Sequence, residues 1–391
     1  MFNLLHKDRS SKARLGKLIT AHGEINTPVF MPVGTQGTVK AISNDELLEC
    51  GAEIMLGNAY HLNLRPGLEI IRKAGGLHKF IGWKGPILTD SGGYQVFSLA
   101  KLRKLSEEGA EFSSHIDGSR HFITPEKAVE IQEILGSDIM MTFDECVHYP
   151  AARDYAEQSL NLTTKWAKRS KDFLHNTQYA IHNTPNHSLR SGSGQANAQL
   201  LFGIVQGSTY PDLRKRAVEE LLSIGFDGYA IGGVSVGEPQ NLIHEISSYT
   251  ASLLPENSPR YLMGMGTPVD MMEAISNGMD MFDCVVPTRN GRNGQAFTWN
   301  GELQLRNSEY KEDFSSIDKD CGCMACRKYT RAYIRHLFNA EEILGLRLVS
   351  LHNIHFYVKL IQKSRQAIKD DCFESFRLEF AGKYITTKRT V

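Results

Sequence analysis

The stretch that decides the fold runs from residue 200 to residue 231 and reads LLFGIVQGSTYPDLRKRAVEELLSIGFDGYAI. Apolar runs at 200–205 and 228–231 flank a segment whose apolar side chains recur with helical spacing on one face. That face comprises Leu213, Ala217, Val218, Leu221 and Leu222, and the charged side chains of Arg214, Arg216 and Glu219 lie elsewhere. A buried strand, an amphipathic helix and a second buried strand predict one βαβ unit with parallel strands.

The same unit recurs along most of the chain. Most of the apolar runs lack a clean alternation of apolar and polar residues, as expected for strands that are buried on both faces. The runs are 28–33, 53–56, 86–88, 138–143, 200–205, 228–231, 260–263 and 281–286. Thr124-Pro125 and Thr267-Pro268 predict the beginnings of two of the intervening helices. Eight repeats predict a (β/α)8 TIM barrel, with an open doubly wound sheet as the structural alternative.

Two stretches interrupt this pattern. Residues 115–123 predict a hairpin around Asp117-Gly118, inserted after the third strand. Residues 175–199 are rich in Asn, Ser, His, Gly and Gln, and they predict a mobile loop with little to bury.

The overall charge is balanced and marks no particular class of partner. Lys plus Arg and Asp plus Glu both number 44, so no global field marks a nucleic-acid or membrane-surface binder, and any basic patch must be local. The N-terminal residues lack an apolar signal region, and nowhere do about eighteen apolar residues run together. We therefore expect a cytoplasmic protein without a membrane partner.

Three of the seven cysteines lie within six residues, as Cys321, Cys323 and Cys326. Three thiolates within reach of one ion predict a zinc site, which needs a fourth ligand. The nearby candidates are His336, His352 and His355, and spacing alone does not rank them. Four protein ligands would exclude water, so this zinc, one per chain, is expected to be structural.

These features divide the chain into three predicted parts. The barrel with its active site takes residues 1–290, and the zinc-binding subdomain takes residues 291–365. A C-terminal segment, residues 366–391, is expected to close on the barrel.

Residues just past the C-terminal ends of barrel strands line the active site in this fold. Asp90, Asp144 and Asp283 stand at three such positions, at or near the ends of the third, fourth and eighth strands. Gln206-Gly207, Gly232-Gly233 and Met263-Gly264 end the fifth, sixth and seventh strands. One such aspartate would as readily cap the next helix. Three together predict a nucleophile and a general acid or base that act at an anomeric carbon. The Gln206 amide and the backbone N–H groups beside the glycines would form hydrogen bonds with the edge of a purine-like base.

The eighth strand leads into residues 287–294, which read PTRNGRNG and predict a short loop. Its Arg289 and Arg292 would pair with phosphates or stack on bases. The alternative is that both are solvated surface side chains.

Five motifs together carry a resemblance to a known family. They are Asp90-Ser91-Gly92-Gly93-Tyr94-Gln95, Phe143-Asp144-Glu145-Cys146, Gly203-Ile204-Val205-Gln206-Gly207, Phe282-Asp283-Cys284-Val285 and the Cys-x-Cys-x2-Cys at 321–326. In this order, over nearly the whole chain, they closely resemble bacterial tRNA-guanine transglycosylase, also called queuine tRNA-ribosyltransferase. That family exchanges guanine at the wobble position of tRNAs with a G-U-N anticodon for a 7-deazaguanine base, in queuosine biosynthesis.

The resemblance implies a role for each site residue. Asp283 matches the nucleophile that forms a covalent enzyme–RNA intermediate, and Asp90 matches the group that moves protons on the two bases. The implied substrate-binding residues are Ser91, Gly92, Gly93, Tyr94, Asp144, Gln206, Gly233 and Met263. The implied RNA-binding residues, for the tRNA anticodon loop, are Gly264, Met265, Gly266, Thr267, Pro268, Val269, Asp270, Thr288, Arg289, Asn290, Gly291 and Arg292. His352 matches the fourth ligand of the structural zinc, and the family implies a homodimer formed through the zinc-bearing region.

Some alternatives stay open. Cys146 and Val236 resemble the pocket for 7-aminomethyl-7-deazaguanine, but Val234-Ser235 departs from the usual Leu-Ala, so queuine is also an expected candidate. An archaeal-type relative that modifies the D-loop usually has further C-terminal domains. A carbohydrate hydrolase leaves the zinc and the arginines unexplained. A non-catalytic RNA-binding partner subunit is disfavoured by Asp90 and Asp283.

Overall fold

The computed structural model describes residues 1–95, 103–182 and 199–386. Eight strands form a closed parallel barrel in the order β10-β11-β12-β13-β14-β4-β5-β6. Their bounds are β4 (Val29–Gly34), β5 (Met55–Asn58), β6 (Ile87–Asp90), β10 (Ile139–Met141), β11 (Leu200–Val205), β12 (Gly228–Ile231), β13 (Arg260–Leu262) and β14 (Met281–Cys284). Because β14 pairs with β4, the sheet has no edge, which confirms the predicted barrel and excludes the open sheet.

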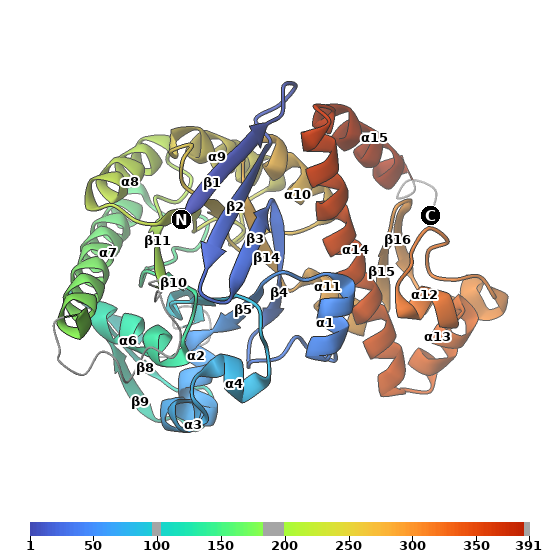
Figure 1. The fold of residues 1–391 in the computed structure, drawn as a ribbon, viewed down its shortest axis with the longest axis horizontal. Helices are drawn as coiled ribbons and strands as arrows, with labels where there is room; N and C mark the ends of the chain where they lie inside the picture. The colour runs from blue at the N-terminus through green and yellow to red at the C-terminus, as the bar shows by residue number, and fades with distance from the viewer. Residues whose placement is uncertain (96–102, 183–198, 387–391) are drawn as a thin grey trace.

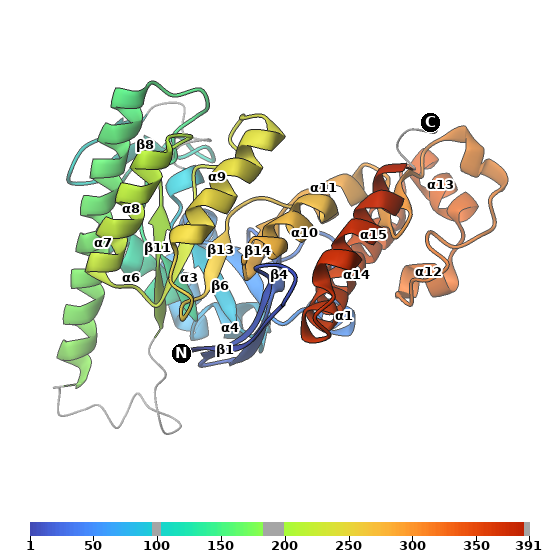
Figure 2. The ribbon, with the colours of Figure 1, turned by 90° about the horizontal axis from the view of Figure 1, so that it is seen from above.

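Helices surround this barrel, as Figures 1 and 2 show. They are α1 (Asn44–Cys50), α2 (Ala59–Leu62), α3 (Leu68–Ala74), α4 (Leu77–Ile81), α6 (Pro125–Leu135), α7 (Arg153–His182), α8 (Pro211–Ile224), α9 (Gln240–Leu253), α10 (Pro268–Ser276) and α11 (Val286–Arg292), with a π-helical turn at Asn63–Gly67. The predicted helix beginnings are confirmed, since the Thr124 and Thr267 hydroxyls accept hydrogen bonds from the N–H groups of Lys127 and Asp270. Two placements on α8 were wrong: Arg214, placed off the apolar face, is fully buried, and Leu222, placed on that face, is exposed.

The sequence analysis missed an antiparallel sheet formed by β1 (Phe2–Lys7), β2 (Arg14–Thr20) and β3 (Gly23–Thr27). Its Leu18 and Ile25 belong to the same hydrophobic cluster as the barrel residues Met31, Leu56 and Phe202. Since β3 leads directly into the start of β4, this sheet covers the N-terminal end of the barrel. The opposite end, where the strands finish, is left for the site.

The predicted hairpin is confirmed. Strands β8 (Ala110–Ser113) and β9 (Arg120–Ile123) pair antiparallel on either side of Asp117-Gly118, and β7 (Arg103–Leu105) adds a third strand. The predicted loop at 175–199 was wrong in its first part, because α7 continues to His182. Residues 183–198 lie outside the described residues.

The C-terminal quarter of the chain lies on one side of the barrel, as both views show. It contains β15 (Gln295–Thr298), β16 (Gly301–Gln304), a 3-10 turn at Ser308–Glu312, α12 (Met324–Lys328), α13 (Arg331–Asn339), α14 (Ile343–Lys369) and α15 (Phe373–Thr386). Helix α14 packs against α11 so closely that a side chain at Gly291 would meet the backbone of Ser350 at 2.9 Å. The boundaries at residues 290 and 365 stay a prediction, and α14 continues across the second.

Candidate active site and metal centre

The three aspartates predicted at the barrel mouth come together in the structure. Asp90 is the last residue of β6, Asp283 lies near the end of β14, and Asp144 follows β10. The charges of Asp283 and Asp144 both act on Asp90 and raise the pKa of its carboxyl. The barrel therefore joins residues that are up to 193 positions apart into one acidic site.

Asp90 is held by the end of the neighbouring strand. Asn58, its partner in the pairing of β5 with β6, donates its side-chain N–H to Oδ2, and the N–H of Ala59 donates to Oδ1 at 3.1 Å. Burial raises the pKa of Asp90 to about 7, and the nearby carboxylates add to the effect. A carboxyl with a pKa near the working pH can both give and take a proton.

Asp144 is tied to a side chain that is also expected to read the base. Gln206 Nε2 donates to Asp144 Oδ2 at 2.7 Å, and the Ser91 hydroxyl approaches Oδ1 at 3.4 Å. Burial raises the pKa of Asp144 to about 6, against the lowering effect of these two hydrogen bonds. For both Asp90 and Asp144 the main cause of the raised pKa is thus desolvation; the charge of Asp283 adds to it at Asp90, and the charge of Glu145 adds to it at Asp144.

Asp283 has two donors on one oxygen. The Tyr261 hydroxyl donates to Oδ1 at 2.6 Å, and the N–H of Gly264 donates to the same atom at 2.8 Å. Burial raises the pKa of Asp283, although both hydrogen bonds favour the ionised form. Because both donors bind Oδ1, Oδ2 is the oxygen that remains for a substrate.

Glycines give the pocket its shape. A side chain at Gly93 would lie 2.6 Å from Asp144 Oδ1, and one at Gly233 would lie 2.1 Å from Gln206 Oε1. Only glycine fits at either place, so bare backbone faces the two polar side chains. Tyr94, half exposed, and Met263, half buried, also stand at the barrel mouth as predicted.

The site includes residues that the sequence analysis missed. Asn58 stands at the end of the second barrel strand, so the strand-end rule that found Asp90 also applies to it. Tyr261 lies inside an apolar strand and gives no signal. Glu238 accepts hydrogen bonds from the N–H groups of Ser235 (2.7 Å) and Val236 (2.8 Å), and thereby holds Ser235 at a left-handed φ of 63°.

The cysteine cluster has the geometry of a closed metal site. His352 Nδ1 lies 3.6 Å from Cys321 Sγ, 3.7 Å from Cys323 Sγ and 3.3 Å from Cys326 Sγ. Tetrahedral zinc with ordinary Zn–S and Zn–N bonds would place these atoms roughly 3.6 Å apart. His352 Nε2 donates to the Phe297 carbonyl at 2.8 Å, which leaves Nδ1 for a metal. Of the three histidines considered, His352 is therefore the one that completes the site.

A second cluster of potential ligands does not have this geometry. His22, His78 and Asp138 lie close together at the N-terminal end of the barrel. The two rings are stacked 3.6 Å apart with an angle of 15° between their planes. A metal bonds in the plane of each imidazole, so one ion cannot serve both of these rings. The arrangement is that of two histidines sharing the Asp138 carboxylate as a hydrogen-bond acceptor.

Comparison with known proteins agrees with this geometry. The family model for queuine tRNA-ribosyltransferase matches residues 8–386. The chain belongs to the queuine tRNA-ribosyltransferase family, whose members are pentosyltransferases. It is 56% identical over 383 residues to the queuine tRNA-ribosyltransferase of Caldanaerobacter subterraneus subsp. tengcongensis, with 98% of this chain and 97% of the relative covered. It is 55% identical to that of Thermoanaerobacter pseudethanolicus over the same shares of the two chains, and 53% identical to that of Halothermothrix orenii, with 98% of each chain covered.

In this member of the family, only part of the predicted RNA-binding loop faces solvent. Gly264 and Thr267 are exposed and Val269 is half buried, whereas Met265, Gly266, Pro268 and Asp270 are buried. Asp270 points inward, where its carboxylate accepts hydrogen bonds from the Thr267 hydroxyl (2.5 Å) and Gln240 and pairs with His244 (2.9 Å). Asp270 therefore holds the loop in place from beneath.

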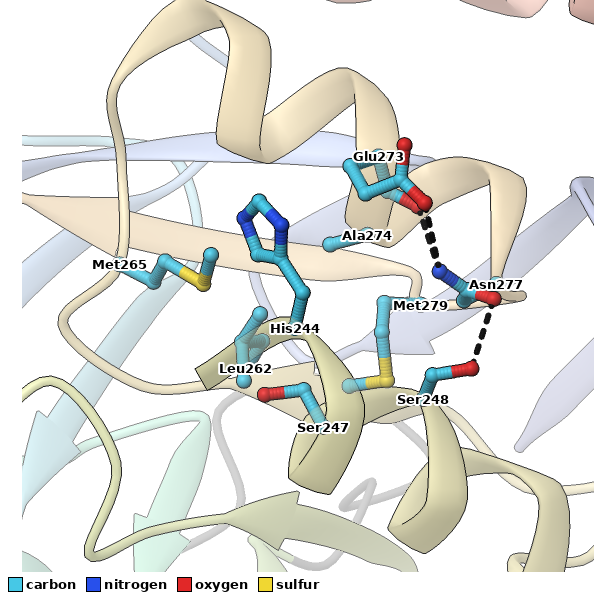
Figure 3. Close-up of a pocket in the computed structure, with 9 residues that line it drawn as sticks. All are labelled: His244, Ser247, Ser248, Leu262, Met265, Glu273, Ala274, Asn277 and Met279. Atoms are coloured by element: carbon cyan, nitrogen blue, oxygen red, sulfur yellow. Dashed lines mark hydrogen bonds between the residues drawn. The ribbon is translucent and has the colours of Figure 1, made fainter. Parts of the chain in front are cut away.

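A small pocket lies beneath this loop, between α9 and α10 (Figure 3). It is lined by His244, Ser247, Ser248, Leu262, Met265, Glu273, Ala274, Asn277 and Met279. None of the three aspartates at the barrel mouth lines it, so it is separate from the active site.

The predicted loop at 287–294 is instead helical over Val286–Arg292, the bounds of α11. Thr288 and Gly291 are buried, Gly291 directly against α14. Arg289 is exposed, and Arg292 is half buried with an Nη1 that has no hydrogen-bond partner among the described residues. On this helix Arg289 and part of Arg292 are thus exposed, whereas Thr288 and Gly291 pack inside.

Within residues 1–95, 103–182 and 199–386, no helix has both the length and the apolar character that a bilayer crossing requires.

Proposed function

We propose that this protein exchanges guanine at the wobble position of G-U-N anticodon tRNAs, those for Tyr, His, Asn and Asp, for a 7-deazaguanine base. Family membership supports tRNA as the substrate class. The observation that carries the chemistry is the pair formed by Asp283, with one oxygen anchored, and Asp90, with a pKa of about 7. A cytoplasmic location is part of the same proposal, because unmodified tRNA is the substrate.

In the first half of the reaction, Asp283 Oδ2 forms a bond to the ribose anomeric carbon as the bond from that carbon to N9 of guanine breaks. Asp90 gives its proton to the departing base and becomes a carboxylate. The hydrogen bonds from Tyr261 and Gly264 to Oδ1 favour the ionised form of Asp283 and orient it for attack. The covalent ester stores the glycosidic bond energy, so the exchange needs no external energy source.

In the second half, the incoming base gives its N9 proton back to Asp90. N9 then bonds to the anomeric carbon, and the bond to Asp283 breaks. Asp144, Gln206 and the backbone of Gly233 hold the edge of each base, and Tyr94 and Met263 enclose its faces. A base that leaves the anticodon stack costs a few kcal/mol, which these contacts offset.

The incoming base is proposed to be 7-aminomethyl-7-deazaguanine. The small side chain of Cys146 is buried two residues past Asp144, and its resemblance to the pocket for the smaller base favours that base over queuine. Competition of each base with labelled guanine decides between the two. Stronger competition by queuine would contradict this choice.

We propose that the cysteine cluster holds one structural zinc ion. Cys321, Cys323, Cys326 and His352 are the ligands, and the soft thiolates suit zinc. When bound, the ion links α12 to α14 and so fastens the segment after the barrel.

We also propose a homodimer formed through the zinc-bearing region. Phe314 and Ile343 are 75% and 74% exposed there, and Tyr333 stacks on Tyr329 with its own side chain partly exposed. Several exposed large apolar side chains in one region are typical of an interface. Light scattering is expected to give twice the chain mass for the wild type and a lower mass for Ile343→Glu. A monomeric wild type at micromolar concentration would contradict the dimer.

The exchange itself is tested with labelled guanine and unmodified tRNA-Tyr. We expect the zinc-loaded protein to incorporate the label, and a tRNA with adenine at the wobble position to take up none. Incorporation into both tRNAs would contradict wobble-base specificity. No incorporation into either would contradict the proposed function.

A further inference from the structure

We propose that Arg214 is a positioning residue that fixes the two groups expected to read the base, Gln206 and the backbone of Gly233, relative to each other. This inference rests on the proposed function. Arg214 lies on α8 outside the barrel and has 0% of its surface exposed. It touches none of the three aspartates, so it would act through the groups that it holds.

Its guanidinium donates to four backbone carbonyls. Nε donates to Ser208 at 2.8 Å, Nη1 to Val205 at 2.9 Å and to Gly232 at 2.7 Å, and Nη2 to Gly233 at 3.0 Å. These carbonyls come from the ends of β11 and β12, the two strands that lead to Gln206 and Gly233. One side chain therefore fastens two neighbouring strand ends to each other.

The hydrogen bond from Arg214 to the Gly232 carbonyl also fixes the orientation of the next N–H group, that of Gly233. The carbonyl of Gly232 and the N–H of Gly233 belong to one trans peptide, in which the two groups point in opposite directions. Because the carbonyl points toward Arg214, the N–H of Gly233 points away from it. The same holds for the carbonyl of Val205 and the N–H of Gln206. Arg214 thus helps to fix which way these backbone donors face, together with the Gly232 N–H, which donates to the Val205 carbonyl at 3.1 Å.

Two conformational features next to Gln206 depend on the same contacts. Ser208 has a left-handed φ of 50°, which is costly for a residue with a side chain, and its carbonyl is held by Arg214. Gly207 has a φ of 126°, and a side chain there would lie 2.9 Å from the backbone nitrogen of Arg214. The chain turns sharply after Gln206, and helix α8 approaches closely enough to stabilise that turn.

The charge of Arg214 argues for a functional role. Within the described part of the chain, no carboxylate lies within ion-pair distance, and Glu238 favours the charged form only from further away. Burial lowers the pKa of Arg214 to about 10, which leaves it charged at neutral pH. A buried charge without a close partner is costly, and an apolar side chain of similar volume often serves stability as well. What an apolar side chain cannot do is bind four carbonyls in fixed directions.

The test uses Arg214→Met, Arg214→Lys and the matched control Arg216→Met. Arg216 lies on the same helix and is part exposed, with ion pairs to Glu157 and Glu220. Steady-state exchange of labelled guanine gives the KM for guanine, the KM for tRNA and kcat for each variant, below the unfolding temperature of all of them.

We expect Arg214→Met to raise the KM for guanine by about tenfold, as for the loss of one well-placed hydrogen bond to the base. The KM for tRNA is expected to change by less than about twofold, because phosphate contacts made elsewhere dominate it. Arg214→Lys should recover part of the loss, and Arg216→Met should leave both constants unchanged. A general loss of stability would not separate the two KM values.

Equal KM values for guanine in Arg214→Met and the wild type would overturn the inference. Unfolded protein from both Arg214 variants would also overturn it, since Arg214 would then serve the fold and not the site. A wild type that incorporates no guanine under these conditions would instead contradict the proposed function on which the inference rests.

Discussion

The base pocket and the metal centre are built in opposite ways. The pocket gathers Asp90, Asp144 and Asp283 from three distant strand ends, and burial works against the charge of each one. The metal centre draws three of its four ligands from residues 321–326, and the fourth ligand, His352, arrives on α14. The pocket therefore costs stability to assemble, whereas the metal centre contributes stability once its ion is bound.

This difference reflects what each site does. A carboxylate that must attack or exchange a proton needs a raised or finely balanced pKa, which burial provides. A structural metal needs only complete and rigid coordination. The two sites should thus respond in opposite directions when their charged groups are removed.

The largest effect is expected at Asp283. We predict that Asp283→Asn lowers the exchange rate by about 10⁴-fold or more, because the amide cannot form the covalent ester. The affinity for tRNA should stay within about threefold, since the substitution changes no phosphate contact. Exchange assays and filter binding measure the two quantities, with the exposed Asp212→Asn as control. Exchange by Asp283→Asn near the wild-type rate would mean that another group is the nucleophile.

Loss of the metal should have the next largest effect. We predict that Cys323→Ser removes the bound zinc and destabilises the segment after the barrel, where the ion contributes on the order of 10 kcal/mol to local folding. Elemental analysis and thermal unfolding check this prediction. Cys372, exposed and outside the cluster, provides the control Cys372→Ser. One zinc ion per chain in Cys323→Ser would contradict the assignment of the ligands.

Substitution of Asp90 should stabilise the folded protein, in contrast to the loss of stability expected for Cys323→Ser. The pKa of Asp90 is about 7 in the folded protein and lies near 3.8 when the group is free. Below about pH 4 the Asp90 carboxyl is protonated in both the folded and the unfolded protein, so it does not affect the free energy of unfolding. As the pH rises from about 4 to about 7, the unfolded protein loses this proton more readily than the folded one, so Asp90 destabilises the fold increasingly. Above about pH 7 this destabilisation is constant. Asp90→Asn should therefore unfold at a higher temperature than the wild type at pH 8, lose this advantage toward pH 4, and fail to exchange guanine. Calorimetry at both pH values is the measurement, and a lower unfolding temperature at pH 8 would contradict it.

The smallest effect is expected at the edge of the pocket. We predict that Arg292→Ala weakens tRNA binding only a few-fold at moderate salt. The slope of log Kd against log salt concentration should fall by about one, which corresponds to one phosphate contact. The side chain of Arg292 is half buried, and its Nη1 has no hydrogen-bond partner among the described residues. Binding is measured at several salt concentrations. The same slope for Arg292→Ala and the wild type would show that this arginine meets no phosphate.

The two sites also differ in how far the sequence predicts them. The cysteine spacing is local, so three metal ligands follow from residues 321–326 alone, while the choice of His352 among three histidines rested on family resemblance. The aspartates could be grouped only because eight apolar runs predicted a barrel, which brings the strand ends together.

Other features were missed. Arg214 precedes Ala217, Val218 and Leu221 by three, four and seven residues, so its spacing places it on the apolar face of α8, and only its charge argued against burial. Tyr261 looks like any apolar strand residue until its hydroxyl is seen to reach Asp283. The N-terminal sheet was missed because β1 alternates half-buried and exposed residues and carries charges that a barrel strand would not. The helix at 286–292 was missed because its Asn290-Gly291 pair favours a turn.

The central claim is that Asp283 carries the tRNA between the two halves of the exchange. The most direct measurement is to trap the protein with unmodified tRNA-Tyr in the absence of an incoming base, separate the mixture on a denaturing gel, and map the linked peptide by mass spectrometry. We predict a protein–RNA adduct whose ribose is attached to Asp283 and which disappears when guanine is added. An adduct on Asp90 or Asp144, or guanine exchange without any adduct, would contradict the account.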